Sequence, residues 1–487
     1  MNDTPETVTQ ALVLAAGMGS RLKSRTPKPL TRVLGLPLLA RTLFTLRDGG
    51  VTDAYVVIGH ESERVRAGID RMTLPGLKVH WLHNPDWKEP NGISVLAGEG
   101  HLHSPFFLTM TDHLFHKDVV TSLQRSGARD GINLAVDYDV HSVIDLDDAT
   151  KVQVSEGQIV AIGKTLPDYN AIDTGVFLAS PAIFGAIQEA RAEGQSSLSA
   201  GVQKLAAKGL ARVTDIGDHM WHDVDTPEDL AEAERKLLDG LRKDSDGPIS
   251  RYINRPISMA LSRLVVNTPV TPNQISISTL VISLIAAGFA AWGGYLAFLI
   301  SGLLFQAASI VDGTDGEVAK LKFQASRYGE WVDTVCDNIS YLAFLMGLIV
   351  GAYRSPLPDL YYMAGVVGFL AGAASILNLT LSVRREKRSG SFLSVRYGYE
   401  DGTGLGSRVM RVVHFMGKRD FFAFLALVLA IVGQLPLALP LFGVGATFLL
   451  FPATLKVNLS SWARVRTANA EAQSASSSKD AGYEPGV

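Results

Sequence analysis

Hydrophobic positions divide the chain into two halves. Between residues 1 and 235 no apolar run is long enough to span a bilayer, whereas long apolar stretches dominate residues 270–465. The join, around residues 237–256, mixes Gly, Asp, Lys and Pro. We therefore expect a cytosolic domain at 1–237, a linker with a juxtamembrane helix at 238–270, a membrane domain at 271–466 and a disordered tail at 467–487.

The second half predicts an all-α membrane domain. A helix needs roughly 20 apolar residues to cross the bilayer core. Six stretches are candidates, at 273–292, 295–320, 330–352, 360–383, 420–436 and 438–460. The last two are separated only by the sequence QLPLALPLF, so their division is the least marked.

Loop charge predicts the orientation. Lys and Arg gather in the loops 320–328 and 383–419 and near the C-terminus, whereas the opposite turns carry a single Arg. Because positive loops stay inside, we expect a multi-pass protein of the cell (inner) membrane. An even number of spans then places both termini and the N-terminal domain in the cytoplasm. The reactive sites of both halves are expected on the same side.

An amphipathic helix is predicted just before the first span. Apolar residues recur there at helical spacing with arginines beside them: Ile253, Ile257, Leu261, Leu264 and Val265, with Arg251, Arg255 and Arg263. This pattern is typical of a helix that lies in the membrane interface with its arginines toward the headgroups. The alternative is an ordinary linker helix.

Composition removes several classes of function. The net charge of −3 gives no whole-chain argument for nucleic-acid binding. A single cysteine, Cys336, excludes a disulfide framework and a cysteine-based zinc site. The N-terminus, MNDTPETVTQ, lacks the basic and apolar regions of a secretory signal.

A phosphate-binding pattern opens the N-terminal half. The apolar run at 11–14 predicts a buried parallel strand, and Gly17, Gly19 and Arg21 follow it. Glycines at the end of a strand let backbone N–H groups approach a phosphate, which Arg21 and the later Lys28 can neutralise. The alternative is a glycine turn of some other α/β protein.

The longer sequence LAAGMGSRLKSRTPKPL resembles the signature of the sugar-nucleotide pyrophosphorylase family. The resemblance implies a Rossmann-like α/β nucleotidyltransferase domain with a mixed, mostly parallel sheet. In that chemistry a phosphate oxygen attacks the α-phosphorus of a nucleoside triphosphate, and cations offset the repulsion. Arg21 is then assigned to the triphosphate and Lys28 to the reacting phosphates, both as catalytic residues. The nucleotide would lie along Leu14, Ala15, Ala16, Gly17 and Gly19.

Two acidic positions are candidate metal ligands. Asp112 ends the apolar strand of LTMTDHLF, and WHDVDTPEDL supplies Asp223 and Asp225 before a helix start. The family resemblance places Asp112 and Asp225 on Mg²⁺ or Mn²⁺. The alternative for Asp225 is a helix cap.

Three further segments resemble those of inositol-1-phosphate cytidylyltransferases: EPNGISVLAG, DLDDATKVQV and NAIDTGVFL. The resemblance implies CTP and inositol 1-phosphate as substrates. It assigns Asn91, Gly92 and Ser94 to the nucleotide, and Lys151 and Asp173 to the acceptor. The chain departs from the family at Pro90, where a glycine is common, and the preference for CTP over UTP rests on resemblance alone.

A four-aspartate motif lies in the second and third spans. Asp312 and Asp315 are three residues apart, and Asp333 and Asp337 are four apart, so each pair lies on one helix face. Carboxylates inside apolar helices are costly without compensation, and two facing pairs make a divalent-metal site. The alternative is a structural ion cluster or a proton path.

The spacing of this motif resembles the signature of the CDP-alcohol phosphotransferase family. The resemblance implies that Asp312, Asp315 and Asp333 chiefly hold metal, with Asp337 both beside it and acting as the base for the acceptor hydroxyl. Gly316, Lys320 and Gly329 would contact the nucleotide. The family usually has Arg where this chain has Lys320, which loses bidentate phosphate contact.

Together the two halves resemble bifunctional inositol-1-phosphate cytidylyltransferase/di-myo-inositol phosphate phosphate synthases. The resemblance implies that CDP-inositol is made, then consumed by a second inositol 1-phosphate, with CMP released, by a homodimer that contacts membrane lipid. One alternative acceptor is a lipid alcohol, and an alternative first alcohol is choline, ethanolamine or a phosphonate. A transporter or receptor with a nucleotide-sensing domain is the non-enzyme alternative.

Overall fold

The computed structural model describes residues 7–127, 130–142, 146–242, 246–385 and 419–480. They form two compact units, Met1–Gly240 and Leu241–Val487.

A nine-stranded sheet forms the first unit, in the order β5-β4-β1-β6-β11-β8-β12-β10-β9. Strand β11 is antiparallel to both β6 and β8, and β10 is antiparallel to β12 and β9, whereas β5, β4, β1 and β6 run parallel. The bounds are β1 Gln10–Ala15, β4 Asp53–Ile58, β5 Lys78–His83, β6 Phe106–Met110, β8 Ile132–Asp137, β9 Lys151–Ser155, β10 Gln158–Gly163, β11 Ala171–Ala179 and β12 Ala211–Asp215.

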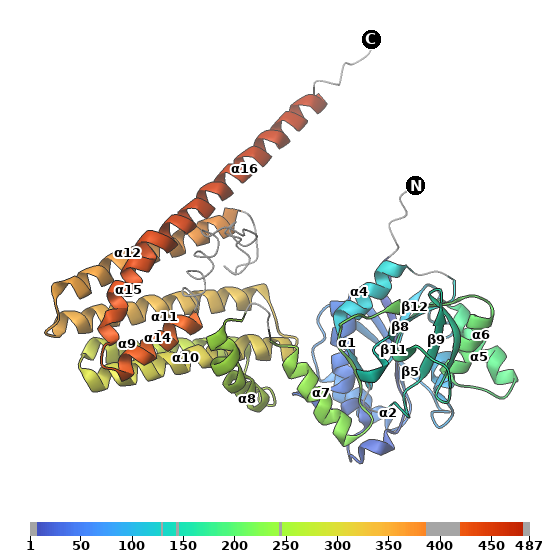
Figure 1. Ribbon diagram of the computed structural model, residues 1–487. Helices are drawn as coiled ribbons and strands as arrows, with labels where there is room; N and C mark the ends of the chain where they lie inside the picture. Colours follow the sequence, from blue (N-terminus) through green and yellow to red (C-terminus); the bar gives the residue numbers. More distant parts are fainter. Residues whose placement is uncertain (1–6, 128–129, 143–145, 243–245, 386–418, 481–487) are drawn as a thin grey trace, which may run out of the picture. The chain divides into compact units, whose positions relative to one another are not determined.

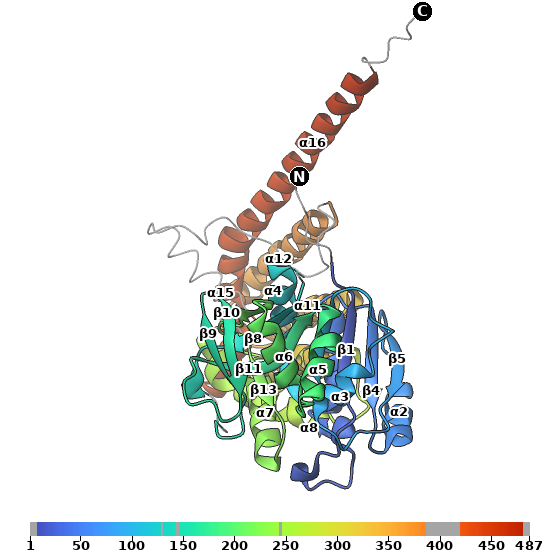
Figure 2. The same cartoon turned by 90° about the vertical axis from the view of Figure 1, so that its right-hand side faces the viewer.

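Helices cover both faces of this sheet (Figures 1 and 2). On one face lie α3 (Asn91–Leu96), α5 (Ala182–Ala192) and α6 (Leu198–Ala207). On the other lie α1 (Leu38–Asp48) and α4 (Lys117–Ser126). Leu12, Leu108 and Phe177 of the sheet join Ile183 and Val202 of the helices in one buried core. The near-continuous apolar strands follow from this burial on both faces.

A short ribbon outside the main sheet carries residues of the site. Strand β7 (His113–Phe115) pairs antiparallel with β13 (Trp221–Asp223), so His113 lies opposite Asp223. Helix α7 (Pro227–Asp239) follows β13. Pairing of β7 with β13 brings together two segments that are about a hundred residues apart in the sequence.

The second unit is helical. Its helices are α8 Arg255–Val265, α9 Pro272–Trp292, α10 Tyr295–Leu321, α11 Arg327–Arg354, α12 Asp359–Arg385, α14 Arg419–Ile431, α15 Ala438–Gly445 and α16 Phe451–Asp480. Among the described residues, five helical segments are long and apolar enough to cross a membrane: α9, α10, α11, α12 and residues 435–467. The stretch predicted as a span at 420–436 contains α14, which has 13 residues. The prediction of six spans is therefore matched in five places.

Close packing of α9 on α11 depends on two glycines. A Cβ atom at Gly347 would lie 2.3 Å from the carbonyl oxygen of Ala287, and one at Gly351 would lie 2.1 Å from that of Ala290. The two backbones are therefore in direct contact, as is common where small residues lie between packed membrane helices. This contact fixes α11, which bears two of the four aspartates.

Helix α8 buries its polar face, whereas the amphipathic pattern predicted that its apolar face would be the buried one. Asn254, Ser258 and Ser262 are buried, and both serines donate to Glu317 of α10, at 2.7 and 2.6 Å. Arg255 also pairs with Glu317, at 2.7 Å. The prediction that Arg255 points to headgroups is thus wrong, because a buried carboxylate holds it. Ile257 and Leu264 are exposed.

The C-terminal stretch also differs from expectation. Helix α16 includes residues 467–480, which the composition predicts to be disordered. Ala, Glu and Gln in this stretch have high helix propensity, so a helix can continue there without an apolar face to bury.

Candidate functional site

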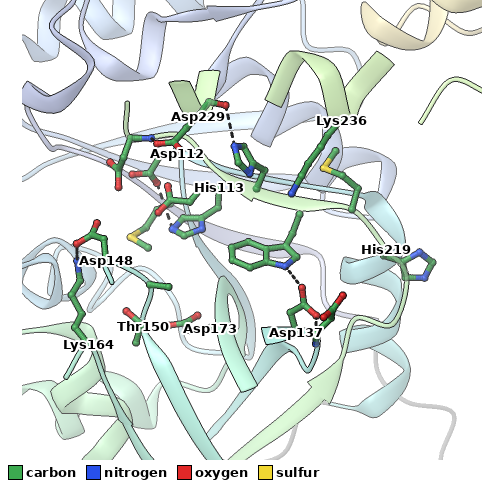
Figure 3. Close-up of a pocket in the computed structure, with 18 of the residues that line it drawn as sticks. Asp112, His113, Asp137, Asp148, Thr150, Lys164, Asp173, His219, Asp229 and Lys236 are labelled. Carbon is green, nitrogen blue, oxygen red and sulfur yellow. Dashed lines mark hydrogen bonds and ion pairs between the residues drawn. The ribbon is translucent and has the colours of Figure 1, made fainter. Parts of the chain in front are cut away.

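A cavity of about 510 Å³ lies in the first unit, where β1, β6 and the β7–β13 ribbon end. Figure 3 shows Asp148 and Lys164 on one side of it and His219 on the opposite side. The predicted residues that line it are Arg21, Asn91, Asp112, Asp173 and Asp225. Ligands of open α/β sheets bind at such strand ends.

The glycine loop after β1 has the geometry that its sequence predicts. Gly19 has a φ of +64°, and a Cβ atom there would lie 2.4 Å from the Cβ of Lys28. Only glycine combines this backbone conformation with such close packing. At Gly17 a Cβ would meet nothing within 4 Å, so the backbone there faces open space. Leu14, Ala15 and Ala16 are buried.

Lys28 joins two of the predicted carboxylates. Its Nζ donates to Asp112 and to Asp225, at 2.6 Å each. Burial opposes the charge of Lys28, yet Asp112 and Asp225 raise its pKa above the usual value. Burial likewise opposes ionisation of Asp112, but Lys28 holds its pKa down at about 2. A fixed ammonium is therefore present at the centre of the site.

Arg21 extends this network. Its guanidinium pairs with Asp225 at 2.7 Å and with Asp148 at 2.5 Å, and half of its side chain is exposed. Asp148 also binds Lys164, at 2.6 Å. Two cations, Arg21 and Lys164, thus line the cavity beside Asp148, where an anionic substrate would meet them.

The carboxylate of Asp225 is not the helix cap. Thr226 caps α7 in a capping box with Asp229 and Pro227 follows it, so the alternative reading of Asp225 is wrong. Asp225 is left to bind Lys28 and Arg21.

The residues of a metal site lie next to it. Asp112, His113 and Asp223 each offer a ligand atom, and these atoms lie within 4.8 Å of one another. Among the described residues, Asp112 Oδ1 and Asp223 Oδ1 are buried without a hydrogen-bond partner. Burial raises the pKa of Asp223 to about 7, with Asp112 and Asp225 adding to the effect. Buried carboxylate oxygens without donors fit a divalent cation. The sequence analysis placed the metal on Asp112 and Asp225 by resemblance to the family and did not assign Asp223 as a ligand.

The residues predicted for the base and the acceptor divide into two groups. Asn91 lines the cavity, whereas Ser94 is buried and accepts a hydrogen bond from Asn84 at 2.9 Å. Gly92 packs on the backbone of Ser196, where a Cβ would lie 2.4 Å from its carbonyl oxygen. Lys151 is buried, and its Nζ donates to the carbonyl oxygens of Asp147 and Lys164, at 3.2 and 2.9 Å.

Asp173 lines the cavity, and burial raises its pKa to about 6. The sequence analysis missed four residues that line the same region: Asp137, Lys164, Trp221 and Lys236. The indole Nε1 of Trp221 donates to Asp137 at 2.7 Å. No motif marks these residues, since they come from four separate elements.

The second unit brings the four motif aspartates together. Asp312, Asp315 and Asp333 each offer an oxygen, and these atoms lie within 4.8 Å of one another. Ser276 of α9 donates to Asp315. Three oxygen donors on two packed helices suit a hard divalent cation such as Mg²⁺.

Arg419, the first residue of α14, was not predicted. Its Nη1 donates to Asp312 at 2.6 Å and also pairs with Asp337. The side chain is 10% exposed, and within the described residues its Nε and Nη2 atoms have no hydrogen-bond partner. Sequence reasoning counted Arg419 only among the loop cations that set orientation.

The two motif glycines differ in surroundings. A Cβ atom at Gly316 would meet no atom of the described residues within 4 Å, so the space beside this glycine is open. At Gly329 the nearest atoms are Ser326 Oγ at 3.2 Å and Asn273 Oδ1 at 3.3 Å. Lys320, four residues after Gly316, is exposed.

Comparison with known proteins divides the chain as the structure does. Residues 11–208 match the MobA-like NTP transferase domain, and residues 269–451 match the CDP-alcohol phosphatidyltransferase family. The inositol-1-phosphate CTP transferase of T. maritima is a similar solved structure: it covers 47% of this chain and 95% of its own, with 28% identity and a TM-score of 0.43.

Two relatives span both halves. The bifunctional IPC transferase and DIPP synthase of Rubrobacter xylanophilus is 36% identical over 82% of this chain and 87% of its own length. The protein of the same description from Aquifex aeolicus is 31% identical over 88% of this chain and 92% of its own. The similarity runs through both units, at an identity that unrelated proteins do not reach over such lengths. The chain therefore belongs to the family of bifunctional IPC transferases and DIPP synthases.

Proposed function

We propose that the first unit joins CTP to inositol 1-phosphate, giving CDP-inositol and diphosphate. The observation that carries this is the Lys28 ammonium, held between Asp112 and Asp225 beneath the glycine loop. Lys28 lies where it can contact both the α-phosphate and the attacking phosphate. The charge of Lys28 offsets the repulsion between the two anions. Its attraction to the phosphates strengthens as negative charge develops in the transition state.

A divalent metal at Asp112, with Asp223 or Asp225, fits this site. When bound, Mg²⁺ or Mn²⁺ would neutralise the phosphates and stabilise the leaving diphosphate. Arg21 would turn from Asp148 and Asp225 to the triphosphate. Gly17 and Gly19 bring backbone close to it, and Asn91 borders the base.

The far part of the cavity suits a phosphorylated polyol. Asp137 and Asp173 offer carboxylate oxygens to hydroxyl groups, and the indole of Trp221 offers a flat apolar face. Lys236 supplies a cation for the phosphate. The amine of Lys151 is occupied by backbone carbonyls, so its role is to hold the 147–164 segment rather than to bind phosphate.

The second unit would transfer phosphoinositol from CDP-inositol to a second inositol 1-phosphate, with release of CMP. Asp312, Asp315 and Asp333 would hold a metal that supplies charge neutralisation to the diphosphate. Open space at Gly316 leaves room for the nucleotide, with Lys320 and Gly329 beside it. Asp337 accepts the proton of the attacking hydroxyl, and the new phosphodiester bond forms as the bond to CMP breaks.

Arg419 favours a phosphorylated acceptor over a lipid alcohol. Its Nη1 pairs with Asp337, whereas Nε and Nη2 form another edge of the guanidinium that is buried without a partner among the described residues. An edge of this kind binds a phosphate with two parallel hydrogen bonds. A diacylglycerol hydroxyl offers no such group, so the lipid product is the second candidate only.

The remaining features follow from the same reading. The loop charges support six spans with a cytoplasmic N-terminal unit. The exposed Ile257 and Leu264 support an interfacial α8 with these side chains toward lipid. A homodimer through the membrane unit is part of the proposal.

Two half-reactions test it separately. Purified protein with CTP, inositol 1-phosphate and Mg²⁺ is expected to release diphosphate. Protein given CDP-inositol and inositol 1-phosphate is expected to release CMP without CTP. Absence of diphosphate release with inositol 1-phosphate, together with release for another phosphorylated alcohol, would overturn the substrate assignment.

A further inference from the structure

A second set of metal-ligating side chains lies at the rim of the first unit's cavity. It consists of His116, Asp118 and His219, and each offers one ligand atom within 4.8 Å of the others. His116 Nδ1 is 3.3 Å from a carboxylate oxygen of Asp118. The imidazoles of His116 and His219 are stacked, with centroids 5.8 Å apart and planes inclined by 22°.

This set is separate from the carboxylates that face the reacting phosphates. His219 lies across the cavity from Asp148 (Figure 3). It is one of the residues that line the cavity, whereas the exposed His116 and the half-buried Asp118 are not among them. A ligand at the set would therefore border the cavity without entering the site around Lys28.

Backbone pairing holds the two histidines together. Strand β7 pairs with β13 as far as Phe115 and Trp221, and the N–H of His116 then donates to the carbonyl of Met220 at 2.9 Å. His116 and His219 thus come from adjacent ends of one antiparallel ribbon. Asp118 lies in the first turn of α4, which begins at the next residue after His116. The three groups are preorganised by backbone that the fold already requires.

The chemistry of the set differs from that of the aspartate clusters. Two imidazoles and one carboxylate suit Zn²⁺ and related transition ions, whereas Mg²⁺ prefers oxygen ligands only. Three protein ligands leave one coordination position open for water or a phosphate oxygen. Since His219 lines the cavity, that position would face it.

We propose that His116, Asp118 and His219 form a transition-metal site, with Zn²⁺ as the fitting ion, at the rim of this cavity. Helix capping alone accounts for only part of the arrangement. The side chain of His116 accepts a long hydrogen bond, 3.4 Å, from the N–H of Asp118. That contact explains His116 and Asp118, but it gives no role to the stacked ring of His219.

Cobalt binding tests the proposal on the full-length protein, purified without a histidine tag and stripped of metal. Excess Mg²⁺ is kept present to fill the aspartate sites, and Co²⁺ is titrated while its visible ligand-field absorption is recorded. We expect one Co²⁺ per chain, displaced by Zn²⁺. Loss of a group that supports a metal ligand typically weakens metal binding by roughly 10–100-fold. Loss of a ligand itself should weaken Co²⁺ binding by at least as much.

Three variants and a control decide the outcome. His219→Gln, His116→Gln and Asp118→Asn are each expected to lose the absorption or shift it to higher Co²⁺ concentration. His103→Gln, which changes an exposed histidine outside the set, should bind as the parent does. Circular dichroism identifies any variant that fails to fold, and the other two then decide. Parent-like Co²⁺ affinity in folded His219→Gln and His116→Gln proteins would overturn the site, and so would absence of Co²⁺ absorption in the parent.

Discussion

Arg419 is ion-paired to Asp337, which comes from a different helix and lies 82 residues earlier in the chain. The same guanidinium nitrogen also binds Asp312, at 2.6 Å. One cation thus joins a proposed metal ligand to the proposed base. Its other two nitrogens, Nε and Nη2, lie buried without hydrogen-bond partners among the described residues.

Arg419→Lys separates charge from geometry. Lysine keeps the cation between Asp312 and Asp337 but lacks the two-nitrogen edge. We expect unchanged diphosphate release and a fall in kcat/KM for inositol 1-phosphate in the transfer step. The fall should be roughly one to two decades, the worth of a charge-assisted hydrogen bond. The measurement is CMP release from CDP-inositol at varied acceptor concentration, and a parent-like kcat/KM would contradict the assignment.

Lys28→Ala should abolish formation of CDP-inositol and leave transfer from supplied CDP-inositol intact. The ammonium that we propose to contact both reacting phosphates would be gone, while the second unit is untouched. Lys208→Ala, which changes a half-exposed lysine paired to Glu189, is the matched control. Equal loss of both activities in a folded Lys28→Ala protein would show that the two reactions are not chemically independent.

Asp173 predicts a pH dependence of stability. Its pKa in the folded chain is about 6, raised by burial from the ordinary value near 3.8. The protonated form is therefore favoured by folding, so this stabilisation is complete below about pH 3.8 and is lost as the pH rises through 6. Asp173→Asn has no titrating group at this position, so its stability should not fall over this pH range. Its amide oxygen can still accept the hydrogen bond from the N–H of Gly175. The variant should gain thermal stability relative to the parent between pH 4 and 6 and keep a constant advantage above it.

Thermal unfolding of the first unit, followed by circular dichroism across this pH range, provides the measurement. Asp168→Asn, at an exposed position, should shift little at any pH. A pH-independent difference between Asp173→Asn and the parent would show that Asp173 does not titrate as described.

Asp337→Asn keeps the shape of the side chain and removes the proposed base. The acceptor hydroxyl is a poor nucleophile near neutral pH, and a general base contributes typically ~10²–10⁴-fold. We expect normal diphosphate release, near-normal CDP-inositol binding and a transfer rate lower by roughly two to four decades. Asp312→Asn should instead weaken metal and nucleotide binding. Transfer at the parent rate by Asp337→Asn would show that another group takes the proton.

Much of the fold was predictable because hydrophobicity reports burial directly. The division into an α/β unit and a helical unit follows from the length of the apolar runs. The glycine loop after the first strand follows from the spacing of its glycines, and Gly19 has the positive φ and the close contact with Lys28 that require glycine. The weaker point was the region after α12. The described part of helix α14 ends at Ile431, so the predicted span at 420–436 is helical only over 420–431 before the chain turns.

The site was predictable only where its residues share a motif. The four aspartates follow from helical spacing, since residues three and four apart lie on one face. Arg419 and Trp221 could not be found this way, because packing of distant elements brings them in. Lys151 shows the converse: resemblance of its segment assigned it to the acceptor, yet its Nζ donates to the backbone carbonyls of Asp147 and Lys164.

One incubation tests the central claim most directly. Purified protein is mixed with CTP, ³¹P-observable inositol 1-phosphate and Mg²⁺, with and without diacylglycerol vesicles, and the phosphorus spectrum is followed in time. The account predicts transient CDP-inositol, then a water-soluble phosphodiester that retains a phosphomonoester, in equal amount to the CMP released and independent of the vesicles. A phosphodiester that forms only with vesicles and partitions into them would contradict it.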